Sequence, residues 1–313
     1  MRRRSLLAVL AAPACLPRRV AAQAPLRVVA SFSILGNMVA EIAGPRAQLR
    51  AIAGPNTDAH AFQPRPSDAE ALRYAALVVR NGLGFDAWMD RVMRSASYRG
   101  PVVTATEGIA PRSMPAHLHH GGAERRPSQA GGPREVPDPH AWQDLRLGMA
   151  YVRNFARGLA AADPAHEAAY RAAGEAYAGR LQALDGWVRA EVAAVPEARR
   201  KVVTSHDAFG YFGAAYGIRF LAPQGVSTES EPSAQQVGAL IRQIRAEGIT
   251  AVFLENMGNP ATLERLAREA GVRVRGRLYA DALSEPAGPA PSYEAMFRHN
   301  VSLLVPAMRG EVA

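Results

Sequence analysis

Short apolar runs rich in β-branched residues alternate along the chain with longer segments of helical periodicity. The runs have the length of buried strands and lie at 26–32, 49–54, 76–82, 101–106, 201–206, 219–222, 250–256 and 272–279. Helical patterns fill gaps between them at 33–43, 67–75, 233–246 and 260–270. Strands that alternate with helices in this way are typical of βαβ units, so we predict an α/β fold with parallel sheets.

A long segment, 164–196, separates two such halves. It is rich in alanine, has a proline at each end and contains no internal proline. This composition predicts one helix of about 45 Å, because an α-helix rises 1.5 Å per residue. We therefore expect two lobes, 25–163 and 197–313, joined by a rigid helix.

The first 24 residues have the character of an export signal. Three arginines near the start precede a short apolar stretch, and small residues follow around Ala22 and Ala24. We interpret residues 1–24 as a cleaved signal peptide. No apolar run reaches the length of about 18–20 residues that a membrane-spanning helix requires.

Charge and cysteine content narrow the possible chemistry. The formal charge of +9 includes five arginines of the presumed signal peptide, so the mature chain carries about +4. No run of basic residues with interleaved aromatic residues is present, so we expect no nucleic-acid partner. Cys15 is the only cysteine and lies in the signal segment. A metal site in the mature chain must therefore use His, Asp and Glu.

The segment 107–138 interrupts the alternating pattern because it is rich in Gly, Pro, Ser and Arg. We interpret most of it as a mobile insertion. It contains His117, His119 and His120, which have two interpretations: a weak capture site for metal ions, or a solvated loop that happens to contain histidines.

Three other histidines and one aspartate lie near predicted strand ends. His60 follows the second strand, His140 lies in "DPHAWQD", His206 closes the fifth strand and Asp281 follows the last. Ligands of open α/β sheets bind at the carboxyl edge of the strands, so two facing lobes would bring these four side chains into one cleft. Three imidazoles and a carboxylate are a suitable ligand set for Zn²⁺. Taken singly, each residue also fits a structural or exposed role, and Asp281 fits a helix N-cap.

Other candidate sites find little support in the sequence. No nucleotide-binding, nucleophile-elbow or zinc-protease motif is present. Ser205, His206 and Asp207 do not form a triad, because consecutive strand residues point to opposite faces. We expect His166 on a solvated helix face and His299 at the surface.

The contexts of the four candidate ligands resemble a known family. "HAFQPRPSD", "NGLGFDAW", "DPHAWQD", "SHDAFGYF", "FLENMGNP" and "LYADALS" occur in this order within residues 26–309. The chain resembles the periplasmic zinc- and manganese-binding proteins of ABC importers, the cluster A-I or cluster 9 solute-binding family. The resemblance implies two (β/α) lobes around a metal site and the ligand set His60, His140, His206 and Asp281. It also implies a periplasmic location and a membrane permease as partner.

The same resemblance bears on the choice of metal. Manganese-binding members commonly have Glu where this chain has His206, whereas zinc-binding members have His there and often a His-rich loop before the second ligand. The histidine at 206 and the sequence "HLHH" therefore favour Zn²⁺. "YADALS" is as similar to the manganese branch, so Mn²⁺ is the alternative.

We predict a monomeric carrier and not an enzyme, because four protein ligands leave no open position for a reactive water. Acceptors for the outer imidazole nitrogens are expected near the ligands in sequence, with Asp58, Asp138, Asp207 and Glu255 as candidates. The alternative from another class is a secreted zinc hydrolase with three His ligands and Asp281 or Glu255 as general base. A binding protein for an organic anion would instead require arginines in the cleft.

Overall fold

A computed structural model of the chain describes residues 24–115, 135–225, 228 and 232–311. The predicted signal peptide lies outside this range, apart from its last residue, and so do His117, His119 and His120. Within the described residues, no helix combines the length and the apolar character that a membrane crossing requires.

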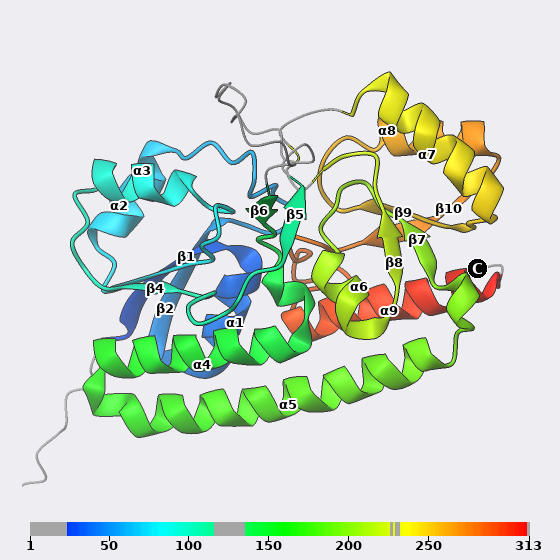
Figure 1. The fold of residues 1–313 in the computed structure, drawn as a ribbon. Helices are drawn as coiled ribbons and strands as arrows, with labels where there is room; N and C mark the ends of the chain where they lie inside the picture. The colour runs from blue at the N-terminus through cyan, green and yellow to red at the C-terminus, as the bar shows by residue number, and fades with distance from the viewer. Residues whose placement is uncertain (1–23, 116–134, 226–227, 229–231, 312–313) are drawn as a thin grey trace, which may run out of the picture.

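Two four-stranded parallel sheets form the centres of two lobes, as predicted (Figure 1). The N-terminal sheet has the order β2-β1-β3-β4, and the C-terminal sheet has the order β10-β9-β7-β8. The strands are β1 (Leu26–Phe32), β2 (Ala47–Ala53), β3 (Leu77–Arg80), β4 (Val102–Thr104), β7 (Lys201–Val203), β8 (Arg219–Leu221), β9 (Ala251–Glu255) and β10 (Val274–Leu278). Each falls within or overlaps an apolar run of the sequence.

Helices connect the strands in both lobes. The N-terminal lobe contains α1 (Ser33–Ala43), α2 (Pro66–Arg73) and α3 (Trp88–Ser95). The C-terminal lobe contains α6 (Gly210–Tyr216), α7 (Ala234–Glu247), α8 (Ala261–Ala270) and α9 (Tyr293–Arg309). The Ser233 hydroxyl accepts a hydrogen bond from the main-chain N–H of Gln236, which gives α7 a capping box. Gly248 then ends α7 in the left-handed conformation that glycine adopts without strain.

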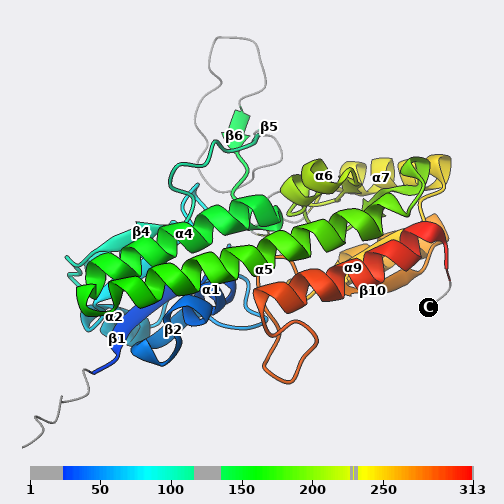
Figure 2. The same ribbon diagram turned by 90° about the horizontal axis from the view of Figure 1, so that it is seen from below.

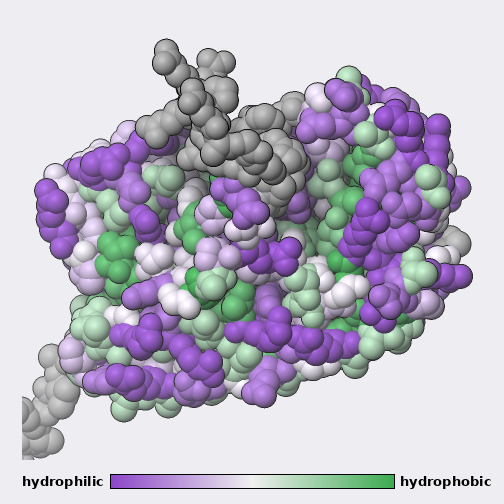
Figure 3. Space-filling model, in the orientation of Figure 1, coloured by the Kyte–Doolittle hydropathy of each residue, from purple (hydrophilic) through white to green (hydrophobic). Residues whose placement is uncertain are grey.

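Two long helices lie beneath the sheets, one under the N-terminal lobe alone and the other under both lobes (Figures 1 and 2). The first, α4 (Leu145–Ala162), was not predicted from the sequence, whereas α5 (Glu167–Ala193) is the predicted connecting helix. They approach closely at Gly174, where an added Cβ would lie 2.7 Å from the Cβ of Ala156. The apolar face of α5 is buried, and hydrophilic side chains cover much of its outer face (Figure 3). One continuous helix thus supports both lobes.

The described ends of the insertion are ordered. Strands β5 (Ser113–Pro115) and β6 (Glu135–Pro137) pair in antiparallel fashion, a hairpin that the sequence analysis did not predict. The hairpin leads directly into Asp138 and His140, and the N–H of Asp138 donates to the Arg112 carbonyl at 2.9 Å. The chain therefore has a fixed position where it leads into the second candidate ligand.

Candidate metal centre

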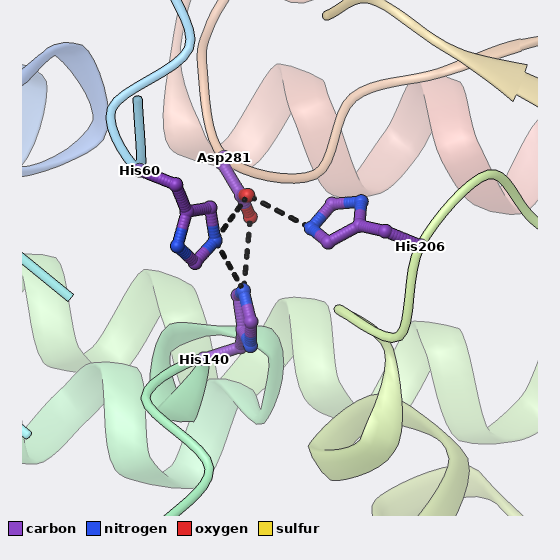
Figure 4. A group of neighbouring side chains, drawn as sticks. All are labelled: His60, His140, His206 and Asp281. Atoms are coloured by element: carbon purple, nitrogen blue, oxygen red, sulfur yellow. Dashed lines mark hydrogen bonds and ion pairs between the residues drawn. The ribbon is translucent and has the colours of Figure 1, made fainter. Parts of the chain in front are cut away.

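The four candidate ligands converge between the lobes (Figure 4). His60 follows β2, and His140 precedes a 3₁₀ turn, η3 (Ala141–Gln143). His206 follows β7, and Asp281 follows β10. Strands β2, β7 and β10 lead into loops at the carboxyl edge of their sheets, which is where parallel sheets place their binding loops. His140 instead follows the hairpin strand β6. Segments up to 221 residues apart in sequence thereby contribute to one cluster.

The inward-pointing atoms have the spacing of a small coordination sphere. The Nε2 atoms of His60 and His140 lie 3.2 Å apart, and Asp281 Oδ2 lies 3.2 Å from His60 Nε2 and 3.0 Å from His206 Nε2. All four ligand atoms lie within 4.8 Å of one another. Zinc–ligand bonds of about 2.0–2.1 Å in tetrahedral geometry require ligand atoms roughly 3.3 Å apart. The donor set and its spacing therefore fit a single divalent ion.

The cluster is shielded from solvent. The side chains of His140, His206 and Asp281 are 0–1% exposed, and that of His60 is 6% exposed. Phe85 packs its ring against His60, with centroids 4.5 Å apart, and Trp142 packs against His140 at 5.2 Å. An ion held here has little access to water, so its entry or exit requires a movement of the protein.

Carboxylates orient two of the imidazoles through their outer nitrogens. Asp138 Oδ1 lies 2.9 Å from His140 Nδ1, and Glu255 Oε2 lies 2.5 Å from His206 Nδ1. Both acceptors were among those expected from the sequence. Such contacts fix the tautomer, so that Nε2 presents its lone pair to a metal.

Among the described residues, the other two expected acceptors form no hydrogen bond with an imidazole. Asp58 accepts hydrogen bonds from the main-chain N–H of His60 and the hydroxyl of Thr228, so it does not orient the imidazole. Asp207 has a raised pKa because it is desolvated and lies near Asp138. Proximity in sequence did not distinguish these carboxylates from Asp138 and Glu255, because the direction of a loop side chain depends on tertiary packing.

The sequence analysis missed Asn81, which holds the residue before the second candidate ligand, His140. Its amide donates to the carbonyl of Pro139 at 3.0 Å, and its side-chain oxygen accepts from the Tyr151 hydroxyl at 2.7 Å. Its main-chain N–H donates to Asp86 at 2.6 Å. Asn81 begins the motif "NGLGFD", which the sequence analysis quoted only as part of the family resemblance. A fully buried asparagine in that motif thus fixes the residue before His140.

Burial and charge act in opposite directions on the imidazoles of the metal-free protein. Desolvation lowers the pKa of His60. Desolvation also opposes protonation of His140, but the charge of Asp281 and the hydrogen bond with Asp138 outweigh it and raise the pKa to about 9. For His206 the charges of Glu255 and Asp281 outweigh desolvation and raise the pKa well above its ordinary value. Burial tends to raise the pKa of Asp281, yet the neighbouring His140 and His206 hold it well below its ordinary value.

The two remaining described histidines lie away from the cluster. His166 Nδ1 is 2.7 Å from Asp163 Oδ2 just before α5, and His299 Nε2 is 2.9 Å from the carbonyl of Arg277. Both side chains are partly exposed. Their local partners account for them without a metal.

Comparison with known proteins places this architecture in a family. The family model ZnuA, "Zinc-uptake complex component A periplasmic", matches residues 28–307. The manganese-binding lipoprotein MntA of Halalkalibacterium halodurans is 31% identical over 281 residues, which cover 90% of this chain and 87% of MntA. The iron-binding protein YfeA of Yersinia pestis is 29% identical and covers 89% of this chain and 85% of YfeA. The structure of the periplasmic zinc-binding protein TroA from Treponema pallidum superposes with a TM-score of 0.80 at 29% identity, covering 91% of this chain and 99% of TroA.

Proposed function

We propose that this chain, which belongs to the ZnuA family of metal-binding components of ABC importers, binds one Zn²⁺ ion outside the cytoplasm and delivers it to a membrane permease. The observation that carries the proposal is the convergence of His60, His140, His206 and Asp281, whose ligand atoms all lie within 4.8 Å of one another. We assign these four residues as the metal ligands. The ion is the cargo of the protein.

The donor set supports zinc as the preferred cargo. Three imidazole nitrogens and one carboxylate oxygen suit a borderline cation, and zinc binds such nitrogen-rich sites more tightly than manganese in the Irving–Williams order. Manganese is the second candidate, because the similar MntA protein is named for manganese binding. The choice between zinc and manganese rests on the side chain at position 206.

We further propose that the protein is a carrier and not a catalyst. Four protein ligands complete a tetrahedral sphere, whereas catalytic zinc sites keep one position for water or substrate. Asp281 and Glu255, the general bases of the hydrolase alternative, are engaged here by imidazoles. Asp281 contacts His206 at 3.0 Å, and Glu255 contacts the Nδ1 atom of the same residue. This arrangement favours retention of an ion over activation of water.

The location and partner follow from the family. We propose that residues 1–24 direct export, that the folded chain acts in the periplasm as a monomer, and that a permease receives the ion. The lobe boundaries 25–163 and 197–313, joined through 164–196, remain our proposal for the domain division.

Competition dialysis with equimolar Zn²⁺ and Mn²⁺ tests the assignment. We expect one zinc ion per chain to displace manganese fully, and we expect His206→Glu to narrow the difference between the two affinities, because a carboxylate oxygen replaces a nitrogen. Glu197→Gln, an exposed change in the same lobe, serves as the control. A preference of the unaltered protein for manganese overturns the choice of zinc, and the absence of binding of either metal overturns the proposed function.

A further inference from the structure

The segment that carries Asp281 belongs to the C-terminal half of the sequence but is fastened to the N-terminal lobe. The carbonyl of Ala280 accepts two hydrogen bonds, from Trp142 Nε1 at 2.9 Å and from Gln143 Nε2 at 2.8 Å. Both donors are fully buried in η3. The residue before the carboxylate ligand is therefore held by the same turn that follows His140.

A second pair of hydrogen bonds holds the other side of Asp281. The N–H of Leu283 donates to the Ser33 hydroxyl of α1 at 3.0 Å, and the carbonyl of Leu283 accepts from the N–H of Asn56 at 2.9 Å. Asn56 lies in the loop that leads to His60. Both polar main-chain groups of Leu283 are thus paired with the N-terminal lobe.

The helix that follows extends this attachment. At the start of α9 the N–H of Tyr293 donates to the side chain of Asn37 on α1 at 2.9 Å, and its hydroxyl bonds to the carbonyl of Trp142. The apolar residues Leu278 and Leu283 pack in the large core, which contains the N-terminal strands and also residues of β7 and β9. A smaller, separate core lies between the C-terminal sheet and helices α7 and α8.

His206 is held differently. Its main-chain N–H donates to Glu255 Oε1 at 2.9 Å, its carbonyl accepts from the Thr204 hydroxyl at 3.0 Å, and its Nδ1 contacts Glu255 Oε2. These partners lie on β9 and in the loop after β7, within the C-terminal lobe. Tyr211 of α6, five residues further on, contacts the N-terminal lobe: its hydroxyl donates to the carbonyl of Asp138 at 3.2 Å and accepts from the N–H of Arg112 at 2.9 Å. Among the described residues, the main chain of His206 itself forms no hydrogen bond with that lobe.

Residues 280–283 also contact the C-terminal lobe, but they form fewer hydrogen bonds with it than with the N-terminal lobe. The amide of Asn256 donates to the Ala282 carbonyl at 3.2 Å, and the same amide donates to Asn56 of the N-terminal lobe at 3.1 Å. The four hydrogen bonds to the N-terminal lobe that flank Asp281 are 2.8–3.0 Å long, and those with Trp142, Gln143 and Ser33 are buried. If the lobes separate, residues 280–283 would lose more hydrogen bonds by moving with the C-terminal sheet than by staying with the N-terminal lobe.

We infer that His60, His140 and Asp281 form a preassembled three-ligand site on the N-terminal lobe, and that His206 is the ligand that arrives last on capture and leaves first on release. The inference rests on the proposed function. It assigns Trp142, Gln143 and Ser33 as positioning residues for a carboxylate that the sequence places in the opposite half.

Distance measurements between spin labels test this division. In a Cys15→Ser background, Glu70→Cys on α2 is paired either with Arg268→Cys on α8 or with Ala287→Cys in the loop after Asp281; all three sites are exposed. Adding Zn²⁺ to the chelator-treated chain should shorten the distance from 70 to 268 by more than about 2 Å. The distance from 70 to 287 should stay constant.

Two ligand variants sharpen the test. His206→Ala should bind one zinc ion with at least tenfold weaker affinity and without shortening the distance from 70 to 268. Asp281→Ala should bind zinc more weakly, but zinc should still shorten its distance from 70 to 268, because His206 continues to bridge the ion to the N-terminal lobe. If a ligand variant does not fold, the two distances in the chain with unaltered ligands still test the inference.

Several results overturn the inference. They are a shortening of the distance from 70 to 287 together with that from 70 to 268, no change in either distance when zinc binds, and closure of His206→Ala by zinc. In each of these cases zinc still binds to the unaltered chain, so the proposed function stands. Absence of zinc binding to the unaltered chain overturns both.

Discussion

At the scale of single residues, carboxylates hold the outer nitrogens of the His140 and His206 imidazoles. Glu255 accepts the main-chain N–H groups of Ser205 and His206 through one oxygen and contacts the His206 imidazole through the other. One buried carboxylate thereby fixes both the loop and the tautomer of the ligand. Loss of such an outer partner commonly weakens metal affinity by a factor of roughly 10–100.

We therefore predict that Glu255→Gln, which preserves the size of the side chain, weakens Zn²⁺ binding by roughly 10- to 100-fold, because an amide is a poorer acceptor for the imidazole N–H. The exposed Glu197→Gln should leave the affinity unchanged. Competition with a chromophoric chelator measures both variants. Equal affinities for the two would show that Glu255 has no role in orienting His206.

Proton release provides a second prediction at this scale. In the metal-free protein the pKa of His140 is about 9, because Asp281 and Asp138 outweigh the desolvation of an imidazole that also faces His60 and His206. A metal-bound imidazole must be neutral, so binding near pH 7.5 displaces a proton from His140. Affinity should be highest above pH 9 and should fall as the pH decreases below that value.

Titration calorimetry in buffers of different ionisation enthalpy measures this release directly. The observed enthalpy should vary linearly with the ionisation enthalpy of the buffer, with a slope of at least about one proton per zinc ion. A zinc affinity that is constant between pH 6 and pH 8 would contradict the protonated state of His140.

At the scale of secondary-structure elements, the sequence predicted what depends on local pattern. The apolar runs coincide with the strands, and α1 has the predicted bounds 33–43. Helix α4 was missed, although its apolar face is buried and the side chain of Asp144 caps its first turn. The cap follows "DPHAWQ" directly, and we had interpreted that stretch only as ligand context.

The placement of the candidate ligands shows the same division between local and tertiary information. Strand ends predicted that the four candidate ligands would share a cleft, and His60, His206 and Asp281 do follow strands of the parallel sheets. His140 reaches the same cluster from the hairpin strand β6, which the sequence pattern did not predict. The identity of the orienting carboxylates was not predictable, since it depends on the rotamers that packing selects. Nor was Asn81, whose partner Pro139 lies 58 residues away.

The hairpin β5–β6 allows a prediction that separates the insertion from the metal centre. Pro115 pairs with Glu135, so a two-residue Asn-Gly turn in place of 116–134 should preserve the pairing and the path to His140. We expect this variant to retain one tight zinc site and to lose at most a second, weaker one. His140→Ala should weaken the tight site at least tenfold, or about 1.4 kcal/mol.

Titration calorimetry on these two variants distinguishes the crowded histidines of the insertion from His140. Loss of tight binding in the shortened chain, combined with unchanged binding in His140→Ala, would move the site into the insertion. A shortened chain that keeps its tight site and loses a weak one would favour the capture role for the histidines at 117, 119 and 120.

At the scale of the whole molecule, an ion at the meeting point of two lobes should stabilise the fold as well as occupy a site. The four candidate ligands come from loops of both lobes. Arg180 on α5 pairs with Glu41 of α1 and with Glu294 at the start of α9. Exposed ion pairs of this kind contribute little by themselves, at most about 1 kcal/mol. A metal ion bound by the four buried candidate ligands would be the stronger connection between the lobes.

We predict that Zn²⁺ raises the unfolding temperature of the chelator-treated chain. An ion present at 1,000 times its dissociation constant adds about 4 kcal/mol to the free energy of unfolding, provided that the unfolded chain does not bind it. For a chain of this size the shift should be on the order of 5–10 °C. The mature chain offers no thiols to compete for zinc when unfolded, since Cys15 lies in the presumed signal peptide. Calorimetric unfolding of the unaltered chain and of His140→Ala, with and without zinc, measures the effect. A shift of equal size in both would mean that the stabilising ion binds elsewhere, and a shift produced by an amino acid or a sugar but not by zinc would exclude metal as the cargo.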